Sequence, residues 1–148
     1  MAYVPQNQVT NNGFAGRINY ELKRAERYRI FVSLVVFNIT PMLEYLSRIE
    51  TSRPNVDFLT AIGEVFRKSV REIDAVSNSG RERIGLLFPE TPRQGAEAAA
   101  RRISDALNIF YANYFGQPAD YPVPVEISSY PDAAGARSLA SYLDEFTE

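Results

Sequence analysis

The chain has 148 residues, 45% of them hydrophobic, and a formal net charge of −2 at pH 7. This length fits one globular domain with a substantial core, and the acidic balance provides no basic footprint for nucleic acid. Cysteine and histidine are absent, which excludes disulfides, thiol nucleophiles, imidazole catalysis and the usual zinc ligand sets. No apolar run approaches the roughly 20 residues of a membrane span and no signal-peptide core follows Met1, so we expect a cytoplasmic protein without membrane insertion.

The first half of the chain shows helical and strand patterns in turn. Residues 1–13 are polar and end in a turn-forming Asn-Asn-Gly sequence, so we interpret them as an N-terminal arm. Hydrophobic residues at spacings of three and four predict an amphipathic helix over 14–28. Residues 30–37 are almost continuously apolar and β-branched, which predicts a central strand covered on both faces. Two helices are expected next, one beginning at Pro41 and one carrying the hydrophobic stripe of 58–70.

A β-hairpin is predicted in the middle of the chain. Residues 73–76 form a short apolar run, 77–80 (Ser-Asn-Ser-Gly) are turn formers, and a second apolar strand is expected over 84–88. Charged residues lie before the first strand and at the start of the second. We therefore expect any chemistry of this protein to lie at the hairpin.

The second half begins with a well-marked helix. Thr91 is expected as its N-cap, Pro92 at its first position and Gln94 at the capping-box position. Residues 110–122 are interpreted as the frayed end of that helix and a loop. Apolar and polar residues alternate over 123–128, which predicts a strand, and the proline within it indicates an edge strand. The chain is expected to end in a helix.

The order of these elements predicts an α+β fold of the broad α/β class. One strand, a helical crossover, a hairpin, a second crossover and a last strand suit a ferredoxin-like arrangement. We expect a central, mostly antiparallel sheet of about five strands flanked by helices, as in nucleotide cyclase palm domains.

Two further patterns have ordinary structural interpretations. A basic stripe on the first helix and the segment after it is interpreted as a solvated helix face; it comprises Lys23, Arg24, Arg27 and Arg29. Aromatic residues at helical spacing late in the chain are either core or a partner-binding patch, with core favoured. They are Phe110, Tyr111, Tyr114, Phe115 and Tyr121.

With these elements in place, the sequence resembles the GGDEF family of bacterial signalling domains, whose active members are diguanylate cyclases that join two GTP molecules into cyclic di-GMP. Residues 14–37 are similar to the family's opening helix and first strand, and 61–89 to its second helix, hairpin and following strand. The sequence LFPET at 87–91 matches the family's exit from that strand. Residues 125–132 look like its late strand, although the usual glycine is absent. The resemblance implies a single domain over residues 14–148.

The resemblance places a degenerate signature in the hairpin. Five residues stand where the family has Gly-Gly-Asp/Glu-Glu-Phe: Gly80, Arg81, Glu82, Arg83 and Ile84. The first glycine and an acidic third residue are retained, whereas the second glycine and the fourth acid are arginines. An arginine in place of the second glycine would fill the space through which the backbone approaches the nucleotide.

The family's metal ligands are also substituted. Its two divalent cations are held by carboxylates from the signature turn and from the end of the first strand, where this chain has Asn38 and Thr40. Neutral ligands offset the metal charge less than carboxylates do. The family's following lysine and guanine-reading asparagine have no counterpart between Pro41 and Pro54. We therefore expect no catalytic residues, no metal, no cofactor and no cyclase activity.

A product-binding motif of the family has a counterpart before the signature. The sequence Arg71-Glu72-Ile73-Asp74 resembles the family's RxxD motif and precedes the signature by the usual five residues. Arg102 matches a further arginine on the helix after the hairpin. An arginine can bind a phosphate or a guanine edge in bidentate fashion, and a carboxylate can accept from guanine N1 and N2. The alternative is that Arg71 and Asp74 form only a surface ion pair.

Two hypotheses for function follow. In the first, the chain is an inactive GGDEF-like regulatory domain that binds cyclic di-GMP through Arg71, Asp74 and Arg102. In the second, it is a protein–protein interaction module that binds no nucleotide. A protein partner in a signalling pathway is expected in both, a homodimer is left open, and residual GTP binding would require an open pocket beside Glu82. The arrangement of Arg71, Asp74 and Arg102 separates the two hypotheses: convergence on one open surface supports the first, and local salt bridges support the second.

Overall fold

A computed structural model describes residues 11–48, 55–77, 82–115, 123–131 and 137–146. Its elements, in chain order, are α1 (Asn11–Tyr28), β1 (Val32–Asn38), α2 (Thr40–Arg48), α3 (Asn55–Lys68), β2 (Ala75–Val76), β3 (Arg83–Pro89), α4 (Arg93–Phe115), β4 (Val125–Tyr130) and the 3-10 helix η1 (Leu139–Tyr142). All strand pairs are antiparallel, in the order β2-β3-β1-β4. The α+β prediction is confirmed, with a sheet of four strands in the described residues rather than about five.

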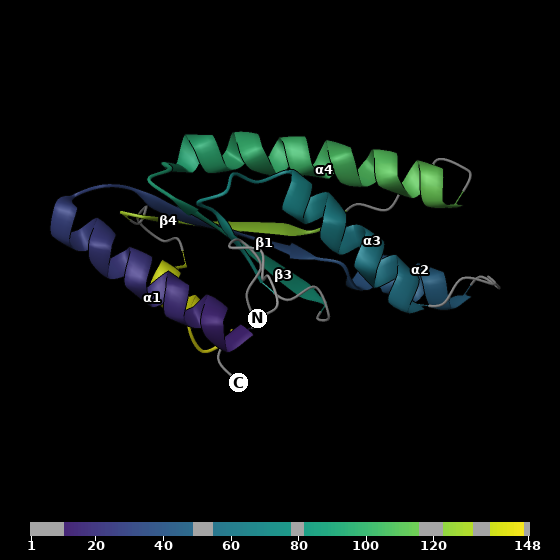
Figure 1. The fold of residues 1–148 in the computed structure, drawn as a ribbon, viewed down its shortest axis with the longest axis horizontal. Helices are drawn as coiled ribbons and strands as arrows, with labels where there is room; N and C mark the ends of the chain where they lie inside the picture. Colours follow the sequence, from purple (N-terminus) through teal and green to yellow (C-terminus); the bar gives the residue numbers. More distant parts are fainter. Residues whose placement is uncertain (1–10, 49–54, 78–81, 116–122, 132–136, 147–148) are drawn as a thin grey trace, which may run out of the picture.

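Helices cover both faces of this sheet. The α3 and α4 helices lie against one face, and α1 with η1 lies against the other (Figure 1). Among the described residues, no helix combines the length and the apolar character needed to cross a bilayer. The sheet with its two helical layers is therefore the frame that positions every candidate site.

The β1 strand is central, as predicted. It pairs with β3 on one side and β4 on the other, with Val35 opposite both Leu86 and Ile127. Alternate side chains of β1 point to opposite layers: Phe37 enters the α3–α4 core, and Leu34 enters the α1–η1 core. Burial on both faces explains why this strand is almost continuously apolar.

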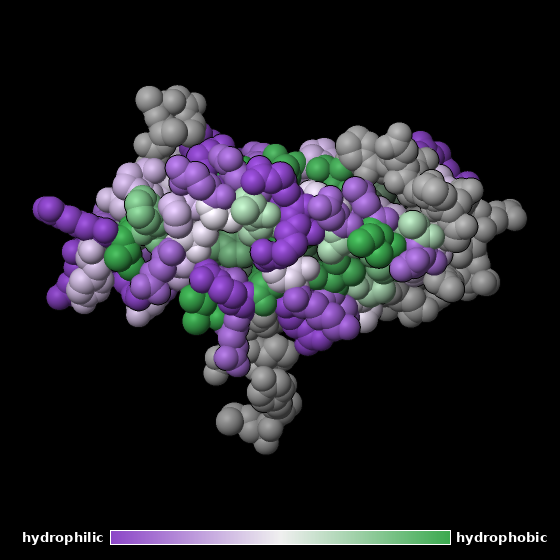
Figure 2. Space-filling view, turned by 90° about the horizontal axis from the view of Figure 1, so that it is seen from above, coloured by the Kyte–Doolittle hydropathy of each residue, from purple (hydrophilic) through white to green (hydrophobic). Residues whose placement is uncertain are grey.

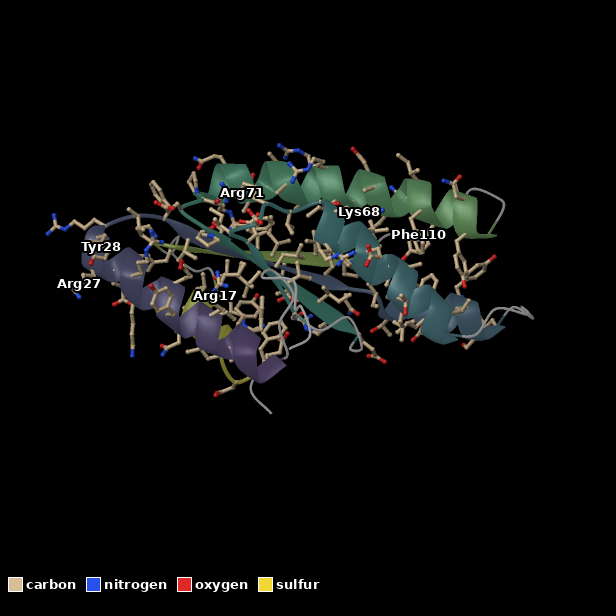
Figure 3. The ribbon with its side chains drawn as sticks, in the orientation of Figure 1. Arg17, Arg27, Tyr28, Lys68, Arg71 and Phe110 are labelled. Atoms are coloured by element: carbon tan, nitrogen blue, oxygen red, sulfur yellow. The ribbon has the colours of Figure 1, made fainter. Side chains whose placement is uncertain are left out.

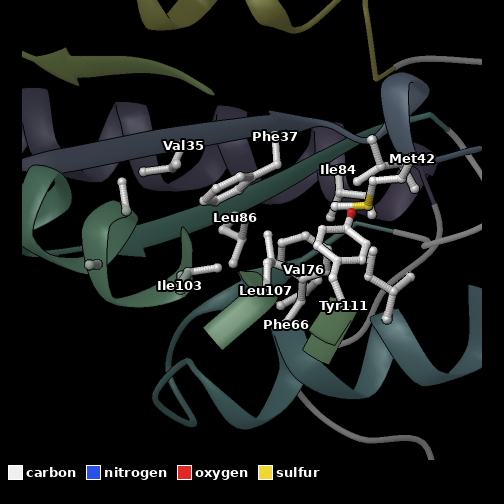
Figure 4. Close-up of a cluster of buried hydrophobic side chains, with 14 of the residues drawn as sticks. Val35, Phe37, Met42, Phe66, Val76, Ile84, Leu86, Ile103, Leu107 and Tyr111 are labelled. Carbon is white, nitrogen blue, oxygen red and sulfur yellow. The ribbon is translucent and has the colours of Figure 1, made fainter. Parts of the chain in front are cut away.

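The larger hydrophobic core lies between the sheet and the α3–α4 layer (Figure 4). The rings of Phe110, Tyr111 and Tyr114 gather around Phe58, with Phe58–Phe110 centroids 5.7 Å apart. Tyr111 is 1% exposed, and burial raises the pKa of its hydroxyl. These contacts hold α4 together as far as Phe115, so the prediction that the helix frays from 110 is wrong.

Three other local predictions differ from the structure. The α1 helix begins at Asn11, so residues 11–13 of the predicted arm are helical and 1–10 lie outside the described residues. Residues 71–74 form a turn in which the amide of Asp74 donates to the carbonyl of Arg71, which leaves Ile73 outside β2. The first α4 hydrogen bond joins Ala96 to Pro92. Thr91 is therefore not the N-cap, because its hydroxyl donates to the carbonyl of Pro89 instead.

Candidate ligand-binding site

Asp74 anchors the turn that precedes β2. Its side chain is 1% exposed and accepts the backbone N–H of Arg71 at 2.7 Å. The guanidinium of Arg71 donates to both carboxylate oxygens of Asp74, with Nη2 3.0 Å from Oδ1 and Nε 3.3 Å from Oδ2. A buried carboxylate needs such donors, and among the described residues they come from Arg71, three residues earlier in the chain.

The same guanidinium joins two parts of the fold. Nη2 of Arg71 lies 3.2 Å from the carbonyl of Pro89, the last residue of β3, and 2.9 Å from Oγ1 of Thr91, in the connection between β3 and α4. The Arg71 side chain nevertheless remains 56% exposed. It is therefore held in a fixed orientation by Asp74 and still presents its outer edge to solvent.

Arg102 approaches from α4. Its Nη2 donates to the carbonyl of Ser69, which follows the last residue of α3, at 2.7 Å. All three predicted ligands line one open pocket of about 230 Å³, together with Phe88, Thr91, Gly95 and Ala99. Figure 3 shows Arg71 beneath the N-terminal half of α4. The three residues thus converge on one surface, and two of them also form a local salt bridge.

Two small residues that open this pocket were not predicted from the sequence. Gly95 and Ala99 precede Arg102 by seven and three residues on α4, so all three lie on the same face of the helix. A Cβ atom at Gly95 would lie 2.9 Å from Cγ2 of Thr91. The helical spacing of two small residues with an arginine was the signal that could have found them.

The charge of the pocket favours an anion. Two guanidiniums face one carboxylate, and that carboxylate already accepts hydrogen bonds from Arg71. The surrounding surface on the α4 side is largely hydrophilic, with hydrophobic residues in separate spots (Figure 2). A ligand carrying phosphate would find donors from both Arg71 and Arg102.

The strand-end and signature positions are occupied by local hydrogen bonds. The hydroxyl of Thr40 donates to Oε2 of Glu82 at 3.1 Å, and the amide of Thr40 donates to Oδ1 of Asn38 at 3.0 Å. Gly80 and Arg81 lie outside the described residues. In the part of the chain that the structure describes, no group of three or more acidic residues is placed to hold a metal ion.

Arg83 and Ile84 serve the fold. Ile84 is fully buried in the larger core. Arg83 donates to both carboxylate oxygens of Glu145, at 2.9 and 3.1 Å, and lies 2.5 Å from a carboxylate oxygen of Glu126. The hydrogen bond to Glu145 raises the pKa of Arg83 against the opposing effect of burial. Arg83 therefore ties β3 to β4 and to the C-terminal segment.

A second arginine completes this network. Arg137 lies 3.6 Å from carboxylate oxygens of both Glu126 and Glu145, and its guanidinium stacks 3.5 Å from the ring centre of Tyr142. The hydroxyl of Tyr142 donates to Glu126. Burial alone would raise the pKa of Glu126, but its hydrogen bond with Arg83, the charges of both arginines and the Tyr142 hydroxyl lower it.

The network predicts a stability that depends on pH. The pKa of Glu126 is lower in the folded than in the unfolded state. The ionised Glu126 side chain therefore contributes its full stabilisation of the fold above the ordinary glutamate pKa of 4.5. It is lost as pH falls through the lower, folded-state value. We expect Glu126→Gln to show a smaller loss of unfolding free energy on acidification than the unmodified chain, measured by urea unfolding across this range. Glu44→Gln, on the exposed face of α2, is the control; equal pH dependence in all three proteins would contradict the prediction.

No protein-family model matches the chain, and no curated protein matches its sequence. Solved structures match its fold. Diguanylate cyclase SiaD of Pseudomonas aeruginosa, determined with its activator SiaC, aligns at a TM-score of 0.65 and 16% identity over 93% of this chain, which spans about half (51%) of the SiaD chain. A DGC protein from Thermotoga maritima aligns at 0.66 and 15% identity, covering 98% of this chain and 100% of its own. The GGDEF domain of DgcB from Caulobacter crescentus, in complex with c-di-GMP, aligns at 0.61 and 12% identity, with 97% and 81% covered.

These alignments establish the fold class. The chain has the fold of GGDEF diguanylate cyclase domains: an antiparallel sheet with α1 on one face and the α3–α4 layer on the other. At identities below a quarter, the likeness concerns the fold alone.

Proposed function

We propose that this chain is a catalytically inactive, GGDEF-like regulatory domain of bacterial signalling that binds cyclic di-GMP in the pocket of Arg71, Asp74 and Arg102. The observation that carries the proposal is the convergence of these residues, from the α3–β2 turn and from α4, on one open and net cationic pocket. The complex of the DgcB domain with c-di-GMP makes this ligand class a reasonable first choice for the fold.

The contacts assign different tasks to the three residues. Asp74 has both oxygens engaged by Arg71, so it orients the guanidinium that meets the ligand. Arg71 and Arg102 would bind phosphate oxygens or the acceptor edge of a guanine, which are the acceptors that a planar guanidinium suits best. The flat side of the guanine would lie against Phe88, Gly95 and Ala99, where small residues leave room.

The substitutions at the strand end and signature support the absence of cyclase activity. Asn38 and Thr40 are neutral, Glu82 accepts from Thr40, and Arg83 is committed to Glu126 and Glu145. Two-metal phosphoryl transfer needs several carboxylates around the cations. We expect GTP and Mg²⁺ to yield no cyclic di-GMP with the purified protein.

Calorimetric titration with cyclic di-GMP tests the proposal. The unmodified protein is expected to bind, and Arg71→Ala or Arg102→Ala to weaken binding at least ~10-fold, because a hydrogen bond to a charged group contributes about 1.5–3 kcal/mol. Arg101→Ala, an exposed arginine next to Arg102 on α4, is the matched control and should bind as the unmodified chain does. If a high excess of cyclic di-GMP gives neither binding heat nor a shift in thermal stability, the proposal that the chain is a cyclic di-GMP receptor is refuted.

The alternative function is a protein–protein interaction module that binds no nucleotide. The observation favouring it is that Arg71 already pairs with Asp74 and Arg102 with the Ser69 carbonyl, so each has a partner without a ligand. SiaD in complex with its activator shows a protein of this fold class in a protein complex. A silent titration together with a loss of stability in Arg102→Ala, which removes the hydrogen bond to Ser69, would favour this alternative.

A further inference from the structure

The outer face of α1 carries a set of residues that neither proposed function uses. Its opposite face, with Phe14, Ile18 and Ala25, is buried against the sheet. The outer face combines exposed aromatic rings with cations, and α1 is followed by one more of each. We define the α1 surface as Tyr20, Lys23, Arg24, Arg27, Tyr28, Arg29 and Phe31.

The aromatic members of the α1 surface are unusually exposed. Tyr20 is 62% exposed, Tyr28 60% and Phe31 49%. The guanidinium of Arg27 lies over the ring of Tyr28, 5.4 Å from its centre. Figure 3 shows Arg27 and Tyr28 projecting from the outer end of α1, away from Arg71. None of the three residues belongs to either hydrophobic core of the described residues, so core packing does not explain them.

The charge of this region is opposite to that of the whole chain. Residues 11–29 contain five of the 16 cationic residues but only two of the 18 acidic ones, Glu21 and Glu26. Glu21 is buried and bonded to Arg24, which leaves Glu26 as the exposed carboxylate of α1. Arg24 also lies 3.7 Å from Glu90. Lys23, Arg27 and Arg29 therefore give the α1 surface a positive field on a protein whose net charge is negative.

The pattern of rings and cations distinguishes between kinds of partner. The centre of a protein–protein interface is depleted of lysine and glutamate, whereas Lys23 and Glu26 lie between Tyr20 and Tyr28 along the helix. The headgroup layer of a bilayer accepts this mixture, because tyrosine rings lie at headgroup level while long cationic side chains reach lipid phosphates. A planar anionic surface also contacts one face only, which leaves the acidic remainder of the molecule in solution.

We propose that the α1 surface binds anionic phospholipid membranes peripherally, with Tyr20, Tyr28 and Phe31 at the headgroup layer and Lys23, Arg27 and Arg29 on lipid phosphates. This inference is independent of cyclic di-GMP binding, since it uses another helix on the other side of the sheet. Binding is weak and reversible, because the surface offers few cations. It requires no membrane-spanning segment.

Vesicle flotation tests the charge requirement. At low salt, the full chain is expected to float with vesicles of phosphatidylcholine mixed with phosphatidylglycerol. It should not float with vesicles of phosphatidylcholine alone, nor with the mixed vesicles at high salt. The double variant Lys23→Glu, Arg27→Glu should lower partitioning at least ~10-fold, since each cation near an anionic surface contributes about 1 kcal/mol. Arg101→Glu on α4 is the matched control for one charge reversal and should retain binding.

A spectroscopic test reports insertion of the ring itself. The chain contains no tryptophan, so Tyr28→Trp introduces a single tryptophan, in the α1 surface, whose fluorescence can be followed. Its emission is expected to shift to the blue with the anionic vesicles and to be quenched by brominated lipid. Unchanged emission, equal flotation with neutral vesicles, or an equal loss in Arg101→Glu would overturn the proposal. So would binding to a single-stranded oligonucleotide in place of the vesicles, since that would assign the surface to nucleic acid.

Discussion

Replacing Asp74 by alanine is expected to lower the free energy of unfolding by about 2–4 kcal/mol. The carboxylate is 1% exposed and accepts the Arg71 backbone amide as well as its guanidinium. Its loss leaves the backbone amide of Arg71 without this acceptor and releases the Arg71 side chain from its orientation, including its contacts to Pro89 and Thr91. Urea unfolding measures the change, and cyclic di-GMP affinity should fall in the same variant.

Two further variants test the charge of Asp74 and provide a control at a neighbouring acidic residue. Asp74→Asn keeps an acceptor oxygen and loses the charge, so its cost should be smaller than that of alanine. Glu72→Ala, two residues earlier and exposed, should stay within about 0.5 kcal/mol of the unmodified protein. An Asp74→Ala protein as stable as Glu72→Ala would show that the bonds to Arg71 add nothing to folding.

Gly85→Ala is expected to destabilise the protein by about 1–3 kcal/mol through overpacking. A Cβ atom at this position in β3 would lie 2.7 Å from Phe14 and 2.8 Å from Phe146. Both rings are buried and in edge contact with each other, so neither can move aside freely. Gly85 also exchanges hydrogen bonds with the buried Ser77, which limits movement of the strand.

Gly16→Ala is the matched control for Gly85→Ala. Gly16 lies in α1, and a Cβ there meets nothing within 4 Å. Alanine should raise the unfolding free energy by about 0.5–1 kcal/mol, because it loses less backbone entropy in a helix than glycine. Thermal or urea unfolding of the two variants should therefore move in opposite directions. Destabilisation by both would show that crowding at Gly85 is not the cause.

The sequence by itself determined the parts of the fold that depend on nearby residues. The apolar runs of β1 and β3 and the alternation of apolar and polar residues in the β4 sequence are patterns of only a few neighbouring residues. Their order then restricts the topology to an antiparallel sheet flanked by helices. The three ligand candidates, Arg71, Asp74 and Arg102, could be named in advance because the chain resembles a family in which these positions bind product.

The tertiary structure decided what depends on residues far apart in the chain. The helix α4 continues to Phe115 only because its aromatic rings find Phe58 on α3. Thr91 does not cap α4, and its hydroxyl instead accepts a hydrogen bond from the guanidinium of Arg71, 20 residues earlier in the chain. Helix propensity and capping rules describe local preferences, and these long-range contacts override them.

The candidate site divides in the same way. Spacing alone placed Arg71 beside Asp74, since three residues in a turn bring their side chains together. Only the packing of α4 on the sheet brought Arg102, Gly95 and Ala99 to the same pocket, across about thirty residues of chain. A local pattern can specify a pair of contacts, but a pocket needs surfaces from separate elements, and their meeting depends on the buried core that packs those elements together.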